Sequence, residues 1–157
     1  MIAKAATISH GGNAVRYSVN KDKAEIVKVN FLPDDISAEA MFQRMVLKQK
    51  EFSSIINKGR PLKRNVIRME ISPTKEESAG WTLADWVRLA NEYIRVFDSI
   101  DLSKKAKRAS AKFTNVKNSQ YVVALHHDAK SGIPHLHIDV NRVDMDGKVN
   151  DDQDRKS

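Results

Sequence analysis

Hydrophobic and polar side chains alternate in three segments of the chain, at residues 25–31, 64–72 and 135–141, which is the pattern of half-buried β-strands. In the first of these segments Val27, Val29 and Phe31 occupy one side, and Lys28 and Asn30 the other. With two further apolar segments, strands are predicted at residues 2–8, 25–31, 64–72, 121–127 and 135–143.

Two other segments have the three- and four-residue spacing of amphipathic helices. The first follows a turn at residues 33–37 and stops near Gly59, and its apolar stripe is Met41, Met45, Phe52, Ile55 and Ile56. The second starts at Thr82 and Asp85, which are spaced as in a capping box. Its predicted buried face is Trp86, Ala90, Tyr93 and Phe97.

This order of elements predicts an α+β fold. We expect an antiparallel sheet of about five strands with the helices packed on one face. The Gly-Gly-Asn sequence at residues 11–13 is expected to form a turn after the first strand.

The composition narrows the class of protein. The chain has 157 residues, which suits one domain, and no apolar run approaches the ~18 residues of a membrane span. The absence of cysteine excludes disulfides and thiolate metal sites. With 27 Lys and Arg against 20 Asp and Glu, the net charge of +7 favours an anionic partner, nucleic acid above all. We expect a cytoplasmic domain that does not enter a membrane.

Four of the five histidines lie within twelve residues, at positions 126, 127, 135 and 137. Side chains on a strand point alternately to opposite faces. In the last strand Leu136, Ile138 and Val140 therefore enter the core, and His135, His137, Asp139 and Asn141 line the other face. Two imidazoles spaced in this way can converge on one cation.

The preceding strand supplies the third ligand. Its residues Val122, Ala124 and His126 share the smaller-sided face, which suits an open site, so we assign His126 and not His127 to the metal. Three imidazoles leave coordination positions for water or substrate, as in catalytic metal sites. Asp128 and Glu70 are candidates to accept the second N–H of a ligating imidazole; a solvated acid is an equally good interpretation of each.

The sequence resembles the conjugative and mobilization relaxases of the HUH endonuclease superfamily, which are tyrosine DNA nickases. The match in their third motif is His126-His127-Asp128, then His135-Leu136-His137, then the run Asn-Arg-Val-Asp at residues 141–144. The amino terminus is similar too, with Tyr17 in the place of the nucleophile. The resemblance covers nearly the whole chain.

The resemblance implies a catalytic domain over residues 1–157, with the metal site on the open face of the sheet. Relaxases of this kind continue with a further helix and often an accessory region, so we expect the domain to be part of a longer protein. The family is assigned manganese or magnesium, whereas imidazole ligands also suit zinc, cobalt or nickel.

The implied reaction is a site- and strand-specific nick in single-stranded DNA at an origin of transfer, with Tyr17 becoming linked to the 5′-phosphate. Implied partners are an accessory mobilization protein and a coupling protein. Candidate DNA contacts are Arg16, Arg68, Lys104, Lys105, Lys107, Arg108, Asn141 and Arg142. For the basic run at 104–108, a solvated loop is an equally good interpretation.

Three other functions are alternatives to that of a relaxase. A replication initiator or transposase of the same superfamily places its tyrosine after the histidine pair, and no tyrosine follows Tyr121 here. A non-catalytic DNA-binding module with a structural metal needs no tyrosine at all. An unrelated hydrolase with a three-histidine metal would release free products.

Overall fold

A five-stranded antiparallel sheet with the order β1-β3-β5-β4-β2 forms the centre of the computed structural model, which describes residues 1–102, 113–127 and 130–151. The strands are β1 (Ile2–Ile8), β2 (Glu25–Asn30), β3 (Val66–Ser72), β4 (Tyr121–His126) and β5 (His135–Asn141). The helices are α1 (Gly11–Asn20), α2 (Ala38–Glu51), α3 (Ser53–Ile56), α4 (Lys75–Ser78), α5 (Leu83–Ser99) and the 3-10 turn η2 (Val116–Asn118). The predicted α+β class and five-stranded sheet are confirmed.

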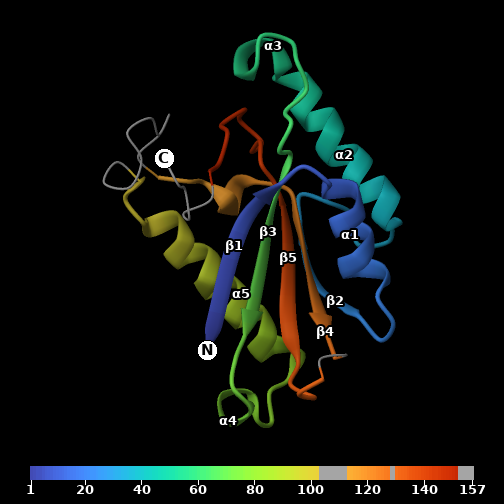
Figure 1. Ribbon diagram of the computed structural model, residues 1–157, viewed down its shortest axis with the longest axis vertical. Helices are drawn as coiled ribbons and strands as arrows, with labels where there is room; N and C mark the ends of the chain where they lie inside the picture. Colours follow the sequence, from blue (N-terminus) through green and yellow to red (C-terminus); the bar gives the residue numbers. More distant parts are fainter. Residues whose placement is uncertain (103–112, 128–129, 152–157) are drawn as a thin grey trace.

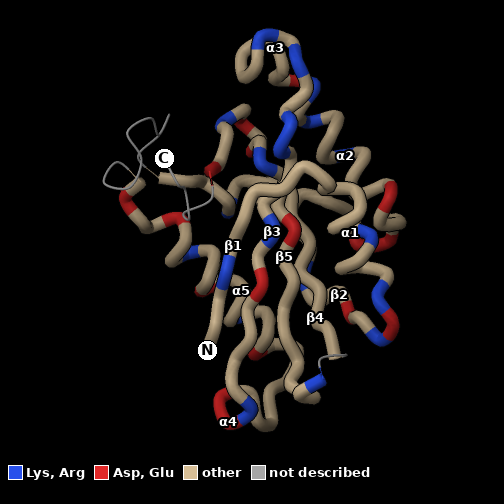
Figure 2. Tube along the Cα trace, in the orientation of Figure 1, with Lys and Arg blue, Asp and Glu red and all other residues tan. Residues whose placement is uncertain are grey.

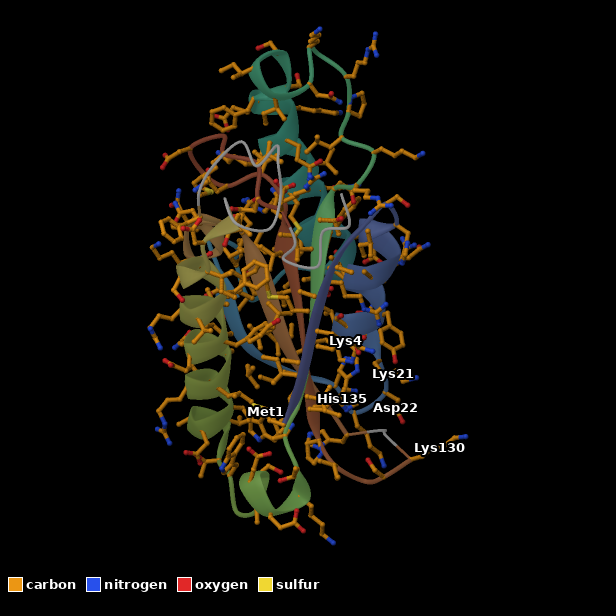
Figure 3. All side chains as sticks on the ribbon, turned by 60° about the vertical axis from the view of Figure 1, so that its left-hand side comes forward. Met1, Lys4, Lys21, Asp22, Lys130 and His135 are labelled. Atoms are coloured by element: carbon orange, nitrogen blue, oxygen red, sulfur yellow. The ribbon has the colours of Figure 1, made fainter. Side chains whose placement is uncertain are left out.

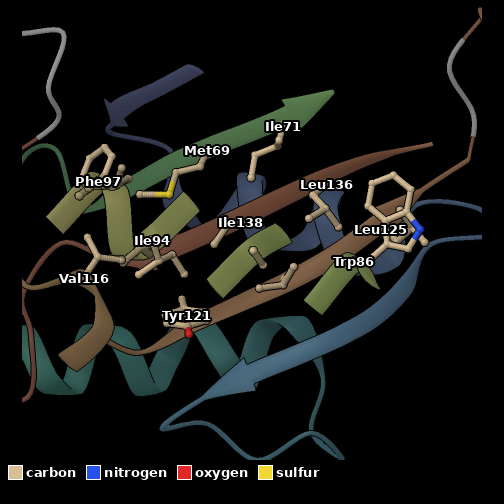
Figure 4. Packing of buried hydrophobic residues seen from close by; sticks show 14 residues of the cluster. Met69, Ile71, Trp86, Ile94, Phe97, Val116, Tyr121, Leu125, Leu136 and Ile138 are labelled. Atoms are coloured by element: carbon tan, nitrogen blue, oxygen red, sulfur yellow. The ribbon is translucent and has the colours of Figure 1, made fainter. Parts of the chain in front are cut away.

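One face of the sheet packs against α5 (Figures 1 and 4). Strand alternation sends Met69 of β3 and Ile138 of β5 to this side, where they meet Trp86 and Phe97 of the helix. The helix begins at the predicted capping box, in which the Thr82 backbone N–H donates to the Asp85 carboxylate at 2.8 Å. This face is a continuous apolar core.

The opposite face is covered in part by α1 and α2 (Figure 1). Val15 of α1 and Met41 and Met45 of α2 pack against Val66 of β3 and Val122 of β4. Helices therefore lie on both faces of the sheet, whereas the sequence predicted them on one face. The face predicted to be open stays open only beside this second, smaller cluster.

The turn predicted at residues 11–13 is instead the first turn of α1. The two glycines serve close packing: a Cβ on Gly11 would lie 2.5 Å from the Val66 side chain and from Asn65 Oδ1. The helix therefore approaches the start of β3 closely, and this approach decides where the rest of α1, including Tyr17, lies over the sheet.

Two predicted patterns are interrupted. A bulge between Ile26 and Lys28 breaks the alternation of β2, so that Val27 packs toward α5 while Val29 packs toward α2. The stripe at 41–56 divides between α2 and α3, and its member Ile55 is 81% exposed. On α5, Ile94 is buried where Tyr93, a predicted core residue, is half-buried. None of the helices in the described ranges has the length and apolar character needed to cross a membrane.

Candidate functional site

Three histidines gather where β4 and β5 pair. His126 lies directly opposite His135, and His137 lies two residues further along β5, opposite Ala124. Their potential ligand atoms all lie within 4.8 Å of one another, and the rings of His126 and His137 are 4.0 Å apart between centroids. His126 and His137 are buried and His135 is half-exposed. The structure therefore brings together the three histidines selected by strand parity.

His127 lies just after the end of β4, apart from this group. Its Nε2 lies 3.2 Å from a carboxylate oxygen of Glu25 on the neighbouring strand β2, and its side chain is 37% exposed. The choice of His126 over His127 thus agrees with the geometry.

Tyr17 of α1 lies beside the histidine group. Its ring centroid is 5.4 Å from that of His126 and 5.6 Å from that of His137. The residue is 42% exposed, so one side of the ring faces the histidines and another is open to solvent. The next residue, Ser18, accepts a hydrogen bond at its backbone oxygen from His126 Nε2 at 2.8 Å. Helix α1 is thereby tied to the histidine group at the position of the tyrosine.

Cationic side chains surround the Tyr17 ring. Lys21, one helical turn further along the chain, places Nζ 5.2 Å from the ring centroid, and the Arg68 guanidinium of β3 lies 5.6 Å from it. Figure 3 shows Lys4, Lys21 and His135 on the side of the sheet that carries α1. Glu70 is an acid on this face, and it pairs with Lys4 at 3.1 Å and with Arg68 at 3.0 Å.

The charges on this face favour a neutral imidazole beside an ionised carboxylate. Burial, reinforced by the neighbouring charges of His126 and His135, lowers the pKa of His137 to about 3. Burial raises the pKa of Glu70, but the hydrogen bond from Lys4 and the positive charges around it outweigh this effect, and the net shift is downward. The Glu70 carboxylate lies 3.8 Å from His137 Nδ1. Glu70 therefore lies beside one of the three histidines that could hold a metal ion.

A second carboxylate, Asp139, is buried on the same face. Burial raises its pKa to about 6, and the nearby Ser18 hydroxyl and Arg68 act in the opposite direction. No hydrogen bond of normal length reaches either carboxylate oxygen from the residues that the structure describes. Asp139 therefore carries a desolvation cost that packing alone does not explain.

The donor set fits a divalent cation. Three imidazole nitrogens within one small volume match the protein ligands of an open metal site. In the described part of the chain, neither ring nitrogen of His137 has a hydrogen-bond partner, although the ring is only 3% exposed. A buried imidazole in this condition is stabilised when it binds a cation.

The predicted DNA contacts separate into three groups. Arg16 and Arg68 lie near Tyr17, where Arg16 pairs with Asn13. The basic residues at 104, 105, 107 and 108, together with Asp128, lie outside the described residues. Asn141 and Arg142 have structural partners instead.

The Asn141 amide is fully buried and donates to Met45 O and Gln120 Oε1, each at 3.0 Å. Arg142 donates to Asn150 O and to the Asp151 carboxylate. Both residues fasten neighbouring segments to the end of β5. We therefore leave them out of the DNA-contacting set.

Sequence reasoning missed two contributors to the site. Lys21 follows Tyr17 by four residues, a spacing that would have linked the two side chains had residues 11–20 been predicted as a helix. The Ser18 contact uses a backbone oxygen, which leaves no signal in the sequence.

Comparison with protein families matched residues 16–157 to the relaxase family described as MobA/VirD2-like, nuclease domain. Neither a search of curated proteins nor a search of solved structures found a match. The family match spans most of the chain and includes Tyr17 and all three histidines. The chain therefore belongs to the MobA/VirD2-like relaxase nuclease domains, a family of DNA-nicking enzymes that act on single-stranded DNA.

Proposed function

We propose that this domain nicks single-stranded DNA at an origin of transfer by transesterification, with Tyr17 as the nucleophile. The observation that carries the proposal is the position of the half-exposed Tyr17 ring beside His126 and His137. A phosphate held at the histidine group would lie next to this hydroxyl-bearing ring. Accessory mobilization and coupling proteins belong to the same proposal.

In the proposed step, Tyr17 Oη attacks the scissile phosphorus. The bond from Oη to phosphorus forms and the bond from phosphorus to the 3′ oxygen breaks. The phenol proton passes to solvent water, which reaches the 42%-exposed side chain, and the departing 3′ oxygen takes up a proton to become a hydroxyl. The product is a 5′-phosphotyrosyl bond, which keeps the strand available for rejoining.

The cations beside Tyr17 orient the phosphate. Arg68 presents a planar guanidinium next to the ring, and Lys21 presents an ammonium one helical turn after Tyr17. Both stabilise the negative charge that grows on the phosphate oxygens in the transition state. Glu70 restrains Arg68 through their 3.0 Å ion pair.

His126, His135 and His137 would hold the divalent cation that relaxases generally use. When bound, the cation supplies Lewis-acid polarisation of the phosphate. The shifted His137 pKa keeps that imidazole neutral and able to donate its lone pair near neutral pH. Manganese and magnesium are the family's usual choice, while an all-imidazole set also suits zinc, cobalt or nickel.

The decisive experiment detects a protein–DNA bond directly. Single-stranded oligonucleotides that tile the transfer origin are incubated with the protein and manganese, and the products are separated on a denaturing gel. We expect a covalent band that shifts the protein's mobility and disappears in Tyr17→Phe. Tyr93→Phe is the matched control, because Tyr93 belongs to α5, across the sheet from the site, and it should keep the band.

Three results would contradict the proposal. Cleaved oligonucleotide with no protein-linked band would indicate a hydrolase that uses water. Undiminished adduct in Tyr17→Phe would assign the nucleophile to another residue. Binding without cleavage in every condition would favour a non-catalytic DNA-binding module.

A further inference from the structure

A small apolar cavity lies between α2, α3 and the loop that leads to β3. Its volume is about 160 Å³, which is small beside a typical drug-sized site. Val46 of α2, Ile56 of α3 and Pro61 and Leu62 of the loop form apolar walls. The cavity is separate from the histidine site, and none of its lining residues takes part in the function proposed above.

Hydrogen bonds hold the walls of this cavity in place. Asn57 Nδ2 donates to the backbone oxygens of Arg60 and Pro61, at 3.3 and 3.1 Å. The Gly59 N–H donates to Ser53 O at 2.9 Å, and Gln49 Nε2 donates to Asn65 O at the start of β3. Both side-chain amides use their donors on the protein. Their oxygens are the amide atoms left to accept a hydrogen bond from an occupant.

The charged residues that line the cavity are positive. Lys50 and Arg60 are among its lining residues, and no acid is. The segment from residue 52 to residue 69 carries Lys58, Arg60, Lys63, Arg64 and Arg68 without a single Asp or Glu. Figure 2 shows Lys and Arg positions along the chain between α3 and the start of β3. An occupant with an apolar ring and a negative phosphate matches this combination.

The cavity lies on the same side of the sheet as Tyr17. Its α2 wall belongs to the helix that packs with α1 over β3 and β4. Arg64, which contacts the Thr7 hydroxyl of β1, and Arg68 follow Arg60 at four-residue intervals toward the tyrosine. From Leu62 to Arg68 the chain extends at most ~20 Å at ~3.3 Å per residue, a span that a few nucleotides of single strand can cover.

We propose that this cavity binds one unpaired nucleobase of the DNA strand, a few nucleotides from the bond that is cut, with Arg60 and Lys50 contacting the adjacent phosphates. The proposal rests on the assignment of single-stranded DNA as substrate. It adds a second contact point, which fixes the register of the strand over Tyr17. Apolar walls supply the contact to the base, and the loop cations supply the contact to the backbone.

The test fills the cavity with a larger side chain and leaves the net charge of the protein unchanged. Ser53→Phe places a ring in the cavity, and Ser54→Phe is the matched control because Ser54 is exposed and does not line it. Fluorescence anisotropy measures binding of each protein to a 20-nucleotide oligo-dT and to an abasic strand with the same number of phosphates. We expect Ser53→Phe to lose ~5-fold or more affinity for oligo-dT and none for the abasic strand, whereas Ser54→Phe matches the parent protein.

A second variant keeps the test decisive if Ser53→Phe does not fold, which circular dichroism reports. Arg60→Ala removes an exposed cation. We expect weaker binding to both strands and a salt dependence whose slope falls by about one. Arg95→Ala on α5, on the far side of the sheet, is the control and should change neither quantity.

Unchanged oligo-dT affinity in folded Ser53→Phe would overturn the proposal. So would binding of phosphatidylserine vesicles by the parent protein that Ser53→Phe abolishes while oligo-dT binding stays intact, because the cavity would then serve a membrane. These measurements require no nicking, so a wrong assignment of Tyr17 would leave them valid.

Discussion

The two faces of the sheet are built from the same strands and differ in the kind of side chain that they bury. On the α5 side, alternating residues such as Met69 and Ile138 are buried among apolar neighbours. On the α1 side, His137 and Asp139 are buried with polar atoms that lack hydrogen-bond partners in the described residues. Burial contributes stability on the first side and costs it on the second. One face is an apolar core, and the other holds the buried polar groups of the proposed site beside a smaller apolar cluster.

Substitutions at two neighbouring residues of β5 distinguish the roles of the two faces most clearly. Ile138→Ala should reduce the free energy of unfolding by about 2–5 kcal/mol, because it opens a cavity in the core. Its adduct yield should be unchanged at temperatures where the protein is folded. His137→Ala should reduce adduct formation by ~100-fold or more, since loss of groups that merely support metal ligands already costs 10–100-fold.

Urea unfolding and the denaturing-gel assay measure these two effects on the same preparations. The loss of stability in His137→Ala should be clearly smaller than in Ile138→Ala. Equal destabilisation by the two substitutions would show that the histidine face supports the fold as much as the core does.

A smaller effect is expected from Asp139→Asn. The folded-state pKa of Asp139, about 6, lies above the value of about 3.9 in an unfolded chain. As pH rises from about 4 to about 6, the unfolded chain loses the proton before the folded protein does. The free energy of unfolding therefore falls as pH rises through this range. Asp139→Asn should therefore stabilise the protein by roughly 1–3 kcal/mol at pH 7 and by little at pH 4.

Thermal unfolding in a chelating buffer at the two pH values measures this difference. Asp35→Asn, at an exposed position, is the control for the loss of one carboxylate. Destabilisation of Asp139→Asn at pH 7 would mean that Ser18 and Arg68 hold the carboxylate in its charged form.

The smallest expected effect concerns the helix that covers the apolar face. Thr82→Ala removes one half of the capping box of α5 and should cost about 1 kcal/mol. Thr74→Ala does the same for α4, which has only four residues, and should cost less. Both should leave adduct yield unchanged. If Thr82→Ala lost more nicking activity than its unfolding explains, the two faces of the sheet would be shown to be coupled.

Local rules predicted much of this molecule. The alternation of apolar residues located the strands, and the spacing of Thr82 and Asp85 located the start of α5 correctly. Parity along β4 and β5 also selected His126, because a residue's face depends only on its position within a strand. The glycines at the start of α1 misled the prediction, since their reason is the contact with Val66 and not a turn.

The sequence by itself determined which three histidines share a face and which tyrosine the family motif selects. Only the tertiary structure decided that α1 crosses that face and sets Tyr17 5.4 Å from His126, with Lys21 and Arg68 around it. It also decided that Asn141 is an internal brace and that Lys50 and Arg60 line an apolar cavity beside α2. Periodicity encodes the direction of a side chain within its own element, whereas distances between elements depend on packing contacts among residues far apart in the chain.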